Sequence, residues 1–395
     1  MRLLFVARPK DFSNALRIRS VAELRRPLLE KQSEYKGLSI LNPIKLLPNS
    51  VPVCRRFNLE LLRLQILWAA RNAGLRAPLL WINDHCAQPL IGTLNERAVV
   101  YDITDDWTLL PATSEAEKTR IRRFDTKLCQ SADLVVVCSK ALERSRKRFS
   151  RRIVTVPNGV NASHYRCCWN PVQARSGSPV FGYLGTLHGD RIDVRLVEQL
   201  ARARPEAKVV LCGPDFFTPS ERGVLHPLQN VELRKPVHYR DVPKVISEFD
   251  VCILPHRCTP FTESLNPIKL WEYLASGKPV AATPVAGFRE MAHLCHLGQG
   301  QEGFLRACGD ALNEDPAMAS ARIKEAETNS WRARSEQLLE VFRQQGWLGR
   351  PIPRPRQSRA RGGGEAGVSE NTDGEALLKE GGSVWEGQKG LCETP

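Results

Sequence analysis

The stretch "LNPIKLWEYLASGKPV" at Leu265–Val280 decides how the second half of the chain is expected to fold. Asn266 suits the N-cap of a helix, Pro267 suits the first helical position, and Gly277 suits the position just past the helix end. The apolar strings "FDVCILP" and "KPVAATP" lie on either side and read as strands. A strand, a helix and a second strand in this order predict a parallel sheet covered by helices.

The hexapeptide that opens this stretch, "LNPIKL", also occurs at Leu41–Leu46, where Pro48 and Pro52 follow it. A proline removes a helix donor and pushes the residue before it toward extended geometry. We therefore expect the first copy to be extended or a turn and the second to be a helix. The recurrence is chance and not an internal repeat.

Strand-like and helix-like segments alternate on both sides of a break rich in Pro, Ser and Gly at Trp169–Val180. The strand candidates are "RLLFVA", "PLLWIN", "AVVYDIT", "DLVVVCS" and "RIVTVPN" before the break, and "VFGYLG", "AKVVLCG", "DVCILP" and "KPVAATP" after it. The predicted fold class is α/β, with two Rossmann-like parallel-sheet domains, residues 1–170 and 171–348, facing a cleft. A last helical pattern covers about Ala317–Gln345. Residues 349–395 are expected to be a disordered tail because of their Gly- and Glu-rich composition.

Composition narrows the class of protein. The chain has 395 residues, of which 42% are hydrophobic, yet no apolar run reaches the roughly 18–20 residues that a membrane helix needs. The start, "MRLLFVARPK", is too short and too charged for a signal peptide. Twelve cysteines without a CxxC or a Cys/His pair at zinc spacing predict neither a metal site nor a disulfide framework. These features are typical of a cytoplasmic protein.

The formal net charge of +14 is most concentrated in "KALERSRKRFSRR" at Lys140–Arg152. Arg144, Arg148 and Arg151 fall at helical spacing and are expected to share a face. One interpretation is an ordinary solvated surface, and the other is contact with an anionic membrane or an acidic polymer. Without a zinc finger, an RNP sequence or a recognition helix, no nucleic-acid partner is predicted.

The helix after Asn266 opens at the carboxyl edge of the expected sheet, where doubly wound folds bind ligands. Its free N–H groups and its dipole favour a phosphate. Lys269 and Glu272 share a face of the helix, so a cation and a carboxylate could hold the diphosphate and the ribose hydroxyls of a nucleotide. The alternative is that Asn266 caps the N–H groups itself and that Lys269 and Glu272 form an ordinary surface pair.

The segment "ESLNPIKLWEYLASGKPVAATP" resembles the donor site of retaining glycosyltransferases with the GT-B fold, the group often called family 4. It is most similar to that of bacterial teichuronic-acid-type and other cell-surface polysaccharide enzymes. Within Pro78–Trp347, further segments resemble the group in its order: "VVYDITDDW", "ADLVVVCSKAL" with "RIVTVPNGVNASHY", "VFGYLGTLHGDRIDVRLVEQLARARPEAKVVLCGPD" and "VHYRDVPKVISEFDVCILP". The resemblance implies sugar transfer, with retention, from a UDP- or GDP-linked donor to a hydroxyl of a glycan, a glycolipid or a lipid-linked acceptor. It implies no further cofactor. A cytoplasmic enzyme of this kind would gain from weak attraction of its basic surface to the anionic inner face of the plasma membrane, which is a hypothesis.

The resemblance also implies a set of site residues. Glu272 matches the glutamate that holds the donor ribose, Arg191 matches the phosphate clamp, and Gly182 with Gly185 match a turn that lets phosphate approach the backbone. Val237–Tyr239 would lie near the base. The donor-binding residues implied are Gly182, Gly185, Arg191, Val237, Tyr239, Glu263, Ser264, Asn266, Ile268, Lys269 and Glu272.

Two residues are candidates for the chemistry itself. His85, after "LLWIND", is expected at the carboxyl end of a strand facing the cleft, where it would contact the sugar or assist proton movement. A structural role is the alternative. Asp106 follows Asp105 in "TDDW", which forms no clear DxD metal site and is also read as a turn at a strand end.

The chain departs from the family pattern in several places. Eight residues separate Glu263 from Glu272 where seven are usual, Ser264 takes the matching place, and Asn161 stands where an aspartate is common. Relatives usually have a strand, a glycine-rich loop and a helix ahead of a segment like "MRLLFVARP", so we expect an abbreviated acceptor domain. Two alternatives therefore remain: a catalytically degenerate scaffold that binds nucleotide or a partner, and a sugar-nucleotide epimerase, which shares the fold.

Overall fold

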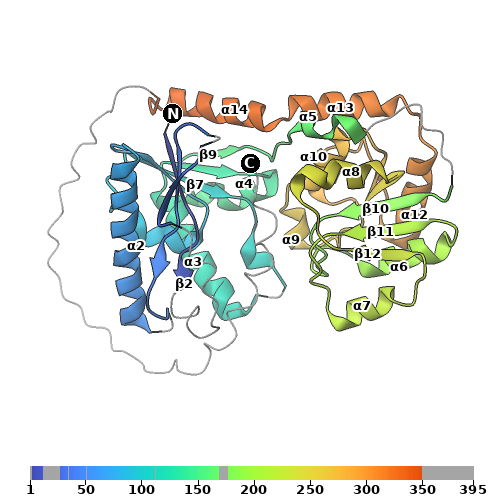
Figure 1. Ribbon diagram of the computed structural model, residues 1–395, viewed down its shortest axis with the longest axis horizontal. Coiled ribbons are helices and arrows are strands. Elements are labelled where there is room, and N and C mark those ends of the chain that lie inside the picture. Colours follow the sequence, from blue (N-terminus) through green and yellow to red (C-terminus); the bar gives the residue numbers. More distant parts are fainter. Residues whose placement is uncertain are drawn as a thin grey trace. The chain divides into compact units, whose positions relative to one another are not determined.

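The computed structural model describes residues 2–11, 27–33, 35–49, 51–111, 113–168 and 177–348 (Figure 1). Contacts within these ranges divide into two compact units. The first unit holds residues up to 101 and 127–134, and the second holds 102–126 and 135–348. The predicted disordered tail at 349–395 and most of the predicted linker lie outside the described residues, so the boundary at residue 170 stays a prediction.

The second unit is built on a six-stranded sheet in the order β12-β11-β10-β13-β14-β15. Its strands are β10 (Val180–Leu184), β11 (Lys208–Cys212), β12 (Val231–Arg234), β13 (Val251–Leu254), β14 (Val280–Ala282) and β15 (His296–Leu297). All neighbouring pairs are parallel, and β13 and β14 are buried along their whole length. Burial on both faces explains why these strands are continuous apolar runs, and it confirms the predicted α/β class.

Helices follow the strands of this sheet, as Figure 1 shows. They are α6 (Val194–Ala203), α7 (Pro219–Leu225), α8 (Val242–Ser247), α9 (Pro260–Glu263), α10 (Ile268–Ala275), α11 (Ala286–Arg289), α12 (Gly300–Leu312), α13 (Met318–Thr328) and α14 (Trp331–Gln344). The single helical pattern expected at Ala317–Gln345 forms two helices instead. The break comes at Ser330, whose side chain accepts a hydrogen bond from Ala333 N and starts α14.

A four-stranded sheet has the order β6-β7-β8-β9. Its strands are β6 (Leu79–Ile82), β7 (Ala98–Ile103), β8 (Leu134–Val137) and β9 (Ile153–Thr155), all at predicted places. The helical segments between and after these strands are η2 (His85–Leu90), η3 (Trp107–Leu109), α3 (Glu115–Ser131), α4 (Lys140–Arg146) and η4 (Lys147–Phe149). After β9 come α5 (Ala162–Tyr165) and η5 (Arg166–Cys168). One further short helix, η6 (Tyr239–Asp241), follows β12 of the six-stranded sheet.

The first unit adds short strands and one long helix, α2 (Pro52–Asn72). β1 (Leu3–Val6), β4 (Leu38–Leu41) and β3 (Leu29–Lys31) form a sheet in the order β1-β4-β3, while β2 (Lys10–Asp11) pairs with β5 (Ile44–Lys45). The first "LNPIKL" therefore runs from the end of β4 into β5, which confirms its predicted extended form. α2 packs Ile66 and Ala69 against Leu41 in the core of this unit.

Among the residues that the structure describes, no helix combines the length and the apolar character needed to cross a membrane.

Candidate donor-binding site

The second "LNPIKL" leads into α10, as predicted, but the helix begins one residue later than expected. Pro267 occupies the N-cap position and makes no side-chain cap. Asn266 instead accepts hydrogen bonds at Oδ1 from Asn158 N (2.9 Å) and from Trp271 Nε1 (3.3 Å). The prediction that Asn266 caps α10 is therefore wrong, because a residue 108 positions earlier competes for its side chain. No described side chain caps α10, and although Leu270 N donates to Pro267 O (3.3 Å), the N–H groups of Ile268 and Lys269 stay available to an anion.

The far end of α10 agrees with the sequence. Gly277 lies just beyond the C-cap with φ +71°, the left-handed conformation that ends many helices. The predicted stop signal is confirmed.

Lys269 and Glu272 meet on one face of α10. The distance between Lys269 Nζ and Glu272 Oε2 is 2.8 Å, and the two side chains are 17% and 9% exposed. A surface pair would keep both groups in water, whereas this pair is largely buried. Removing two charges from water costs free energy that an ordinary helix surface never incurs. The interpretation as an ordinary surface pair is therefore wrong.

Four tyrosines surround Glu272. Burial raises the pKa of Tyr165, Tyr183, Tyr239 and Tyr273, and the negative charge of Glu272 adds to the effect in each. The pKa of Tyr183 rises to about 12. Tyr165 is fully buried, and its hydroxyl has no hydrogen-bond partner among the described residues. All four phenols therefore stay neutral around the carboxylate.

The two predicted glycines have different roles. Gly185 follows β10 with φ +157°, and a Cβ there would lie 3.0 Å from Tyr183 Oη and 3.2 Å from Lys269 Cε. A side chain would strain the backbone and crowd Lys269. Gly182 lies inside β10, and its Cβ would lie 2.1 Å from the ring of Phe249. This corrects the expectation for Gly182, whose missing side chain leaves room for the ring of Phe249 rather than for a phosphate.

Arg191 lies in the turn after β10, with its side chain 33% exposed. Its Nη2 is 3.9 Å from Asp105 Oδ1, and its Cζ lies 5.4 Å from the centroid of the Phe261 ring. Burial raises the pKa of Asp105, and Arg191 partly opposes that rise. Asp105 was not among the predicted site residues, although "TDDW" had drawn attention to the segment.

His256 is a second residue that the sequence did not single out. It is 4% exposed, its ring lies 5.2 Å from Phe288 and 6.5 Å from Tyr183, and neither ring nitrogen has a hydrogen-bond partner among the described residues. Burial, with a smaller effect of Arg191, lowers its pKa to about 3. His256 is therefore neutral beside the cation of Arg191.

The residues ahead of α10 hold local structure. Glu263 pairs with Arg289 at the surface (Oε2 to Nη2 2.6 Å), and Ser264 Oγ donates to Phe261 O (2.6 Å). Ser264 O in turn accepts a hydrogen bond from Ser139 Oγ (2.6 Å). These contacts hold the segment that precedes α10 in place. The stretch between Glu263 and Glu272 has one residue more than the family pattern.

Of the remaining predicted residues, Ile268 and Val237 are exposed to solvent and Tyr239 stacks on another ring. Ile268 and Val237 are 40% and 39% exposed, at the start of α10 and just before η6. The ring of Tyr239 stacks on that of His164, with the two centroids 4.3 Å apart and the planes 12° apart. The structure thus brings Gly185, Lys269 and Glu272 together. The charge of Glu272 raises the pKa of Tyr239, and the charge of Arg191 partly opposes the rise in the pKa of Tyr183.

Asp106 has a structural place. It is 5% exposed, caps η3 by accepting a hydrogen bond from Thr108 N (3.1 Å), and forms an ion pair with Arg146. Arg146 also bonds Asp125 (Nε to Oδ2 3.0 Å). Burial favours a raised pKa for Asp106, but the hydrogen bonds and charge of Arg146 outweigh it, so the pKa is lowered. The geometry is that of the strand-end turn, which was the alternative interpretation of "TDDW".

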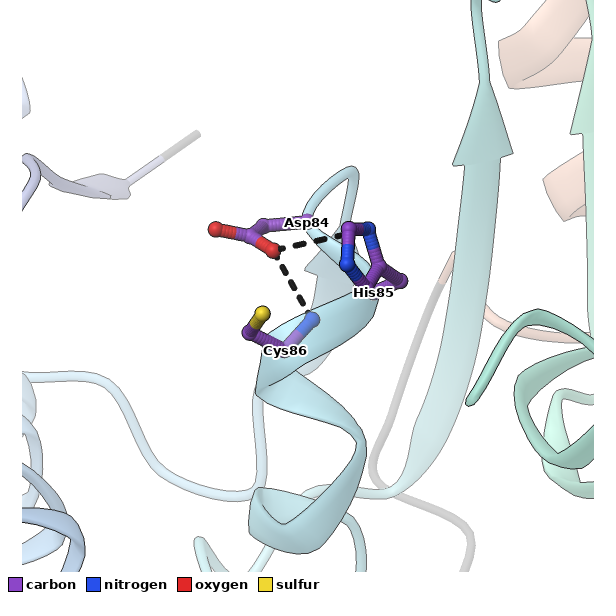
Figure 2. A group of neighbouring side chains, drawn as sticks. All are labelled: Asp84, His85 and Cys86. Carbon is purple, nitrogen blue, oxygen red and sulfur yellow. Dashed lines mark hydrogen bonds and ion pairs between the residues drawn. The ribbon is translucent and has the colours of Figure 1, made fainter. Parts of the chain in front are cut away.

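His85 begins η2 after β6, at the carboxyl end of the strand as predicted. Figure 2 shows it beside Asp84, with 4.0 Å between His85 Nδ1 and Asp84 Oδ1. His85 is 4% exposed, so little of the ring is open to a substrate. The side chains of Asp84, His85 and Cys86 offer ligand atoms within 4.8 Å of one another and could hold a metal ion, although none was predicted. The carboxylate of Asp84 also caps η2 by accepting from Cys86 N (2.8 Å).

Part of the second unit matches a known protein family. The family model described as glycosyl transferases group 1 matches residues 178–322. A Bacillus subtilis (strain 168) protein assigned to teichuronic acid biosynthesis as the glycosyltransferase TuaH is 26% identical over 276 residues, which cover 64% of this chain and 68% of that protein.

Solved structures show the same fold. Sucrose-phosphate synthase from Thermosynechococcus elongatus matches with a TM-score of 0.62 and 15% identity, covering 88% of this chain and 99% of that one. Anabaena HepE in complex with UDP matches with a TM-score of 0.59 and 16% identity, covering 87% and 100%. The fold is GT-B, and the matched domain contains α10, Gly185 and Arg191. Residues 178–322 therefore resemble the glycosyl transferases of group 1, and the chain has the fold of GT-B enzymes.

Proposed function

We propose that the protein transfers a sugar from a nucleoside diphosphate sugar to an acceptor hydroxyl, with retention at the anomeric carbon. The observation that carries the proposal is the largely buried Lys269–Glu272 pair at the uncapped start of α10, beside Gly185. Buried charge is costly unless other groups compensate it, and a diphosphate and a ribose provide such groups.

The cationic residues and the carboxylate of the site would bind different parts of the donor. Lys269, Arg191 and the first N–H groups of α10 stabilise the negative charge that develops on the diphosphate as the bond from the anomeric carbon to the phosphate oxygen breaks. Glu272 accepts hydrogen bonds from the ribose hydroxyls. The acceptor oxygen forms the new bond to the anomeric carbon and releases its proton. Retention is implied by the family resemblance.

Tyr239 and Val237 would flank the base. Tyr239 is fixed by stacking on His164, whereas Val237 is exposed. Since HepE binds UDP and UDP-glucose in its solved complexes, we propose a uridine diphosphate donor, with a guanosine diphosphate donor as the alternative.

For the acceptor we propose a glycan or a lipid-linked saccharide of the cell envelope, by analogy with the role assigned to the Bacillus relative. His85 stays our candidate for an acceptor contact, and its low exposure requires the segment around η2 to open first. Asp106 is the weaker catalytic candidate because Arg146 and Thr108 already occupy its oxygens.

The basic segment Lys140–Arg152 gives a further contact, with an anionic membrane at the cytoplasmic face. The segment is not one regular helix, because α4 ends at Arg146 and η4 follows it. Arg146 is buried in its ion pairs and takes no part, whereas Arg144, Arg148 and Arg151 are exposed. These exposed cations would attract anionic headgroups.

The proposed function is tested by measuring whether the protein converts nucleotide-sugar donors. Release of UDP from UDP-sugars is measured with and without glycan acceptors, for the wild type and for Glu272→Gln. Acceptor-dependent release that falls about 100-fold or more in the variant, as expected when a charge-assisted contact to the donor is lost, supports a transferase. Conversion of the donor without an acceptor would instead show an epimerase, and binding without any turnover would show a scaffold.

A further inference from the structure

The outward face of α2 carries an apolar stripe for which the fold offers no partner among the described residues. Its members are Val53, Phe57, Leu64 and Trp68, which are 74%, 48%, 55% and 47% exposed. At about 3.6 residues per turn they fall within about 60° of one another around the helix axis. The opposite face of the same helix holds Ile66 and Ala69 in the core of the first unit.

This exposure is concentrated in one part of the chain. The large apolar residues exposed between Leu46 and Trp68 are Leu46, Leu47, Val51, Val53, Phe57, Leu64 and Trp68. Leu47 is fixed beside α2 because Asn58 Nδ2 donates to Leu47 O (2.7 Å) and Asn58 Oδ1 accepts from Leu47 N (3.2 Å). The apolar surface therefore continues from the stripe past the start of the helix. Contiguous apolar surface of this kind marks an interaction site.

Positive charge borders the stripe. Arg56 and Arg63 lie along one side of it and Arg71 lies in line with it, while Glu60 pairs with Arg63 (2.8 Å). A second copy of the chain seated on this face would bring like charges together, which disfavours self-association. An anionic lipid surface would match both features, because its headgroups neutralise arginines and its acyl boundary takes apolar side chains. Aromatic side chains such as Phe57 and Trp68 are typical of helices that lie at the membrane interface.

We propose that α2 lies in the plane of an anionic membrane, with Val53, Phe57, Leu64 and Trp68 inserted at the acyl boundary and Arg56, Arg63 and Arg71 on the headgroups. This inference rests on the proposed function in one respect, since a lipid-linked acceptor would be presented at that surface. It assigns to α2 an apolar contact with the membrane, in addition to the contact of the exposed cations in the basic segment Lys140–Arg152.

The test is sedimentation of the full chain with phosphatidylcholine vesicles that contain or lack phosphatidylglycerol. The double variant Phe57→Gln/Trp68→Gln should bind the anionic vesicles about tenfold or more weakly than the wild type, because both anchoring rings are lost. The matched control is Phe216→Gln/Trp331→Gln, which removes two rings of similar exposure, 40% and 44%, from the second unit and should bind like the wild type. Cooperative urea unfolding followed by circular dichroism checks that every variant is folded, independently of UDP binding.

Three outcomes overturn the inference: no binding of the wild type to anionic vesicles, equal binding of all variants, or a wild-type dimer that Phe57→Gln/Trp68→Gln converts to a monomer. The last result would assign the stripe to a second copy. The triple variant Arg144→Gln/Arg148→Gln/Arg151→Gln measures the charge-only contribution and should lose only salt-sensitive binding. Absent UDP binding with intact vesicle binding would contradict the proposed function and leave the inference on α2 standing.

Discussion

The two copies of "LNPIKL" have the same six residues and different structures. In the first copy, Lys45 ends β5 and Asn42 Nδ2 donates to Pro27 O (3.0 Å). In the second, Lys269 is in the first turn of α10 and pairs with Glu272. The residue that follows at the position of Glu272 is Pro48 in the first copy. A hexapeptide therefore sets neither conformation nor role; the downstream residues decide the first and distant neighbours decide the second.

The largest difference between the copies should appear in nucleotide binding. Lys269→Ala removes a cation beside the expected diphosphate and leaves Glu272 without its partner, so UDP affinity should fall roughly 100-fold, equivalent to about 2.7 kcal/mol. Lys45→Ala changes the same residue in the same hexapeptide and should leave affinity within about twofold of the wild type, because β5 has no part in the site. Calorimetric titration with UDP measures both. Equal losses in the two variants would break the comparison.

The next largest difference should appear in the free energy of unfolding when Asn266 and Asn42, the matching asparagines of the two copies, are replaced. Asn266→Ala leaves Asn158 N and Trp271 Nε1 without their acceptor, and we expect about 2 kcal/mol of lost unfolding free energy. Asn42→Ala removes one side-chain hydrogen bond and should cost about 1 kcal/mol. Urea unfolding followed by circular dichroism provides the two values. A larger loss for Asn42→Ala would show that the second copy is the less constrained one.

Lowering the pH should destabilise the structure around the second copy at a higher pH than the structure around the first copy. Leu265 packs with Phe261 against Leu110 and Trp107, next to the buried Asp106–Arg146 pair. The folded pKa of Asp106 is lowered, so its contribution to stability is fully present above the unfolded pKa of about 3.9 and is lost as the pH falls from there through the folded pKa. We expect about 1.5 kcal/mol of destabilisation in this window.

Hydrogen exchange between about pH 2 and pH 6 tests this, with the pH dependence of intrinsic exchange removed. Amides around Leu265 should lose protection in acid, while those around Leu41 keep it. Asp106→Asn should remove the pH dependence at Leu265, and a dependence that persists in that variant would refute the assignment to Asp106.

The smallest effect concerns the helix end that only the second copy has. Gly277→Ala places a side chain at φ +71°, with Ile323 Cδ1 3.1 Å from the new Cβ, and should destabilise by about 1 kcal/mol. Pro48→Ala, downstream of the first copy, should leave stability nearly unchanged because Pro48 ends no helix. Thermal unfolding compares them, and a stabilised Gly277→Ala would contradict the role of the glycine.

The fold could be predicted because its signals are local. Buried strands such as β13 are continuous apolar runs, and Gly277 marks a helix end within its own segment. β12 ("VELR") and β15 ("HL") were missed because they are short and polar or too brief to show a period. Figure 1 shows β12 at one edge of its sheet. Its two central residues, Glu232 and Leu233, are exposed, so the strand needs few apolar side chains.

The site could be predicted only in part, because many of its contacts are long-range. Lys269 and Glu272 are three residues apart, so the sequence showed their pairing but not their burial. The partner of Asn266 lies 108 residues away, and the ring that fills the space beside Gly182 belongs to Phe249. Tyr165 and His256 become notable only when the fold surrounds them with Glu272 and Arg191.

The central claim is that α10 holds a nucleoside diphosphate through Lys269 and Glu272. The most direct test is calorimetric titration of UDP, GDP and their sugar conjugates into the wild type and into Glu272→Ala. We predict that the wild type binds one nucleotide series and that the variant loses most of this affinity while unfolding cooperatively like the wild type. Equal binding by both proteins, or no nucleotide binding by a folded wild type, would contradict the account.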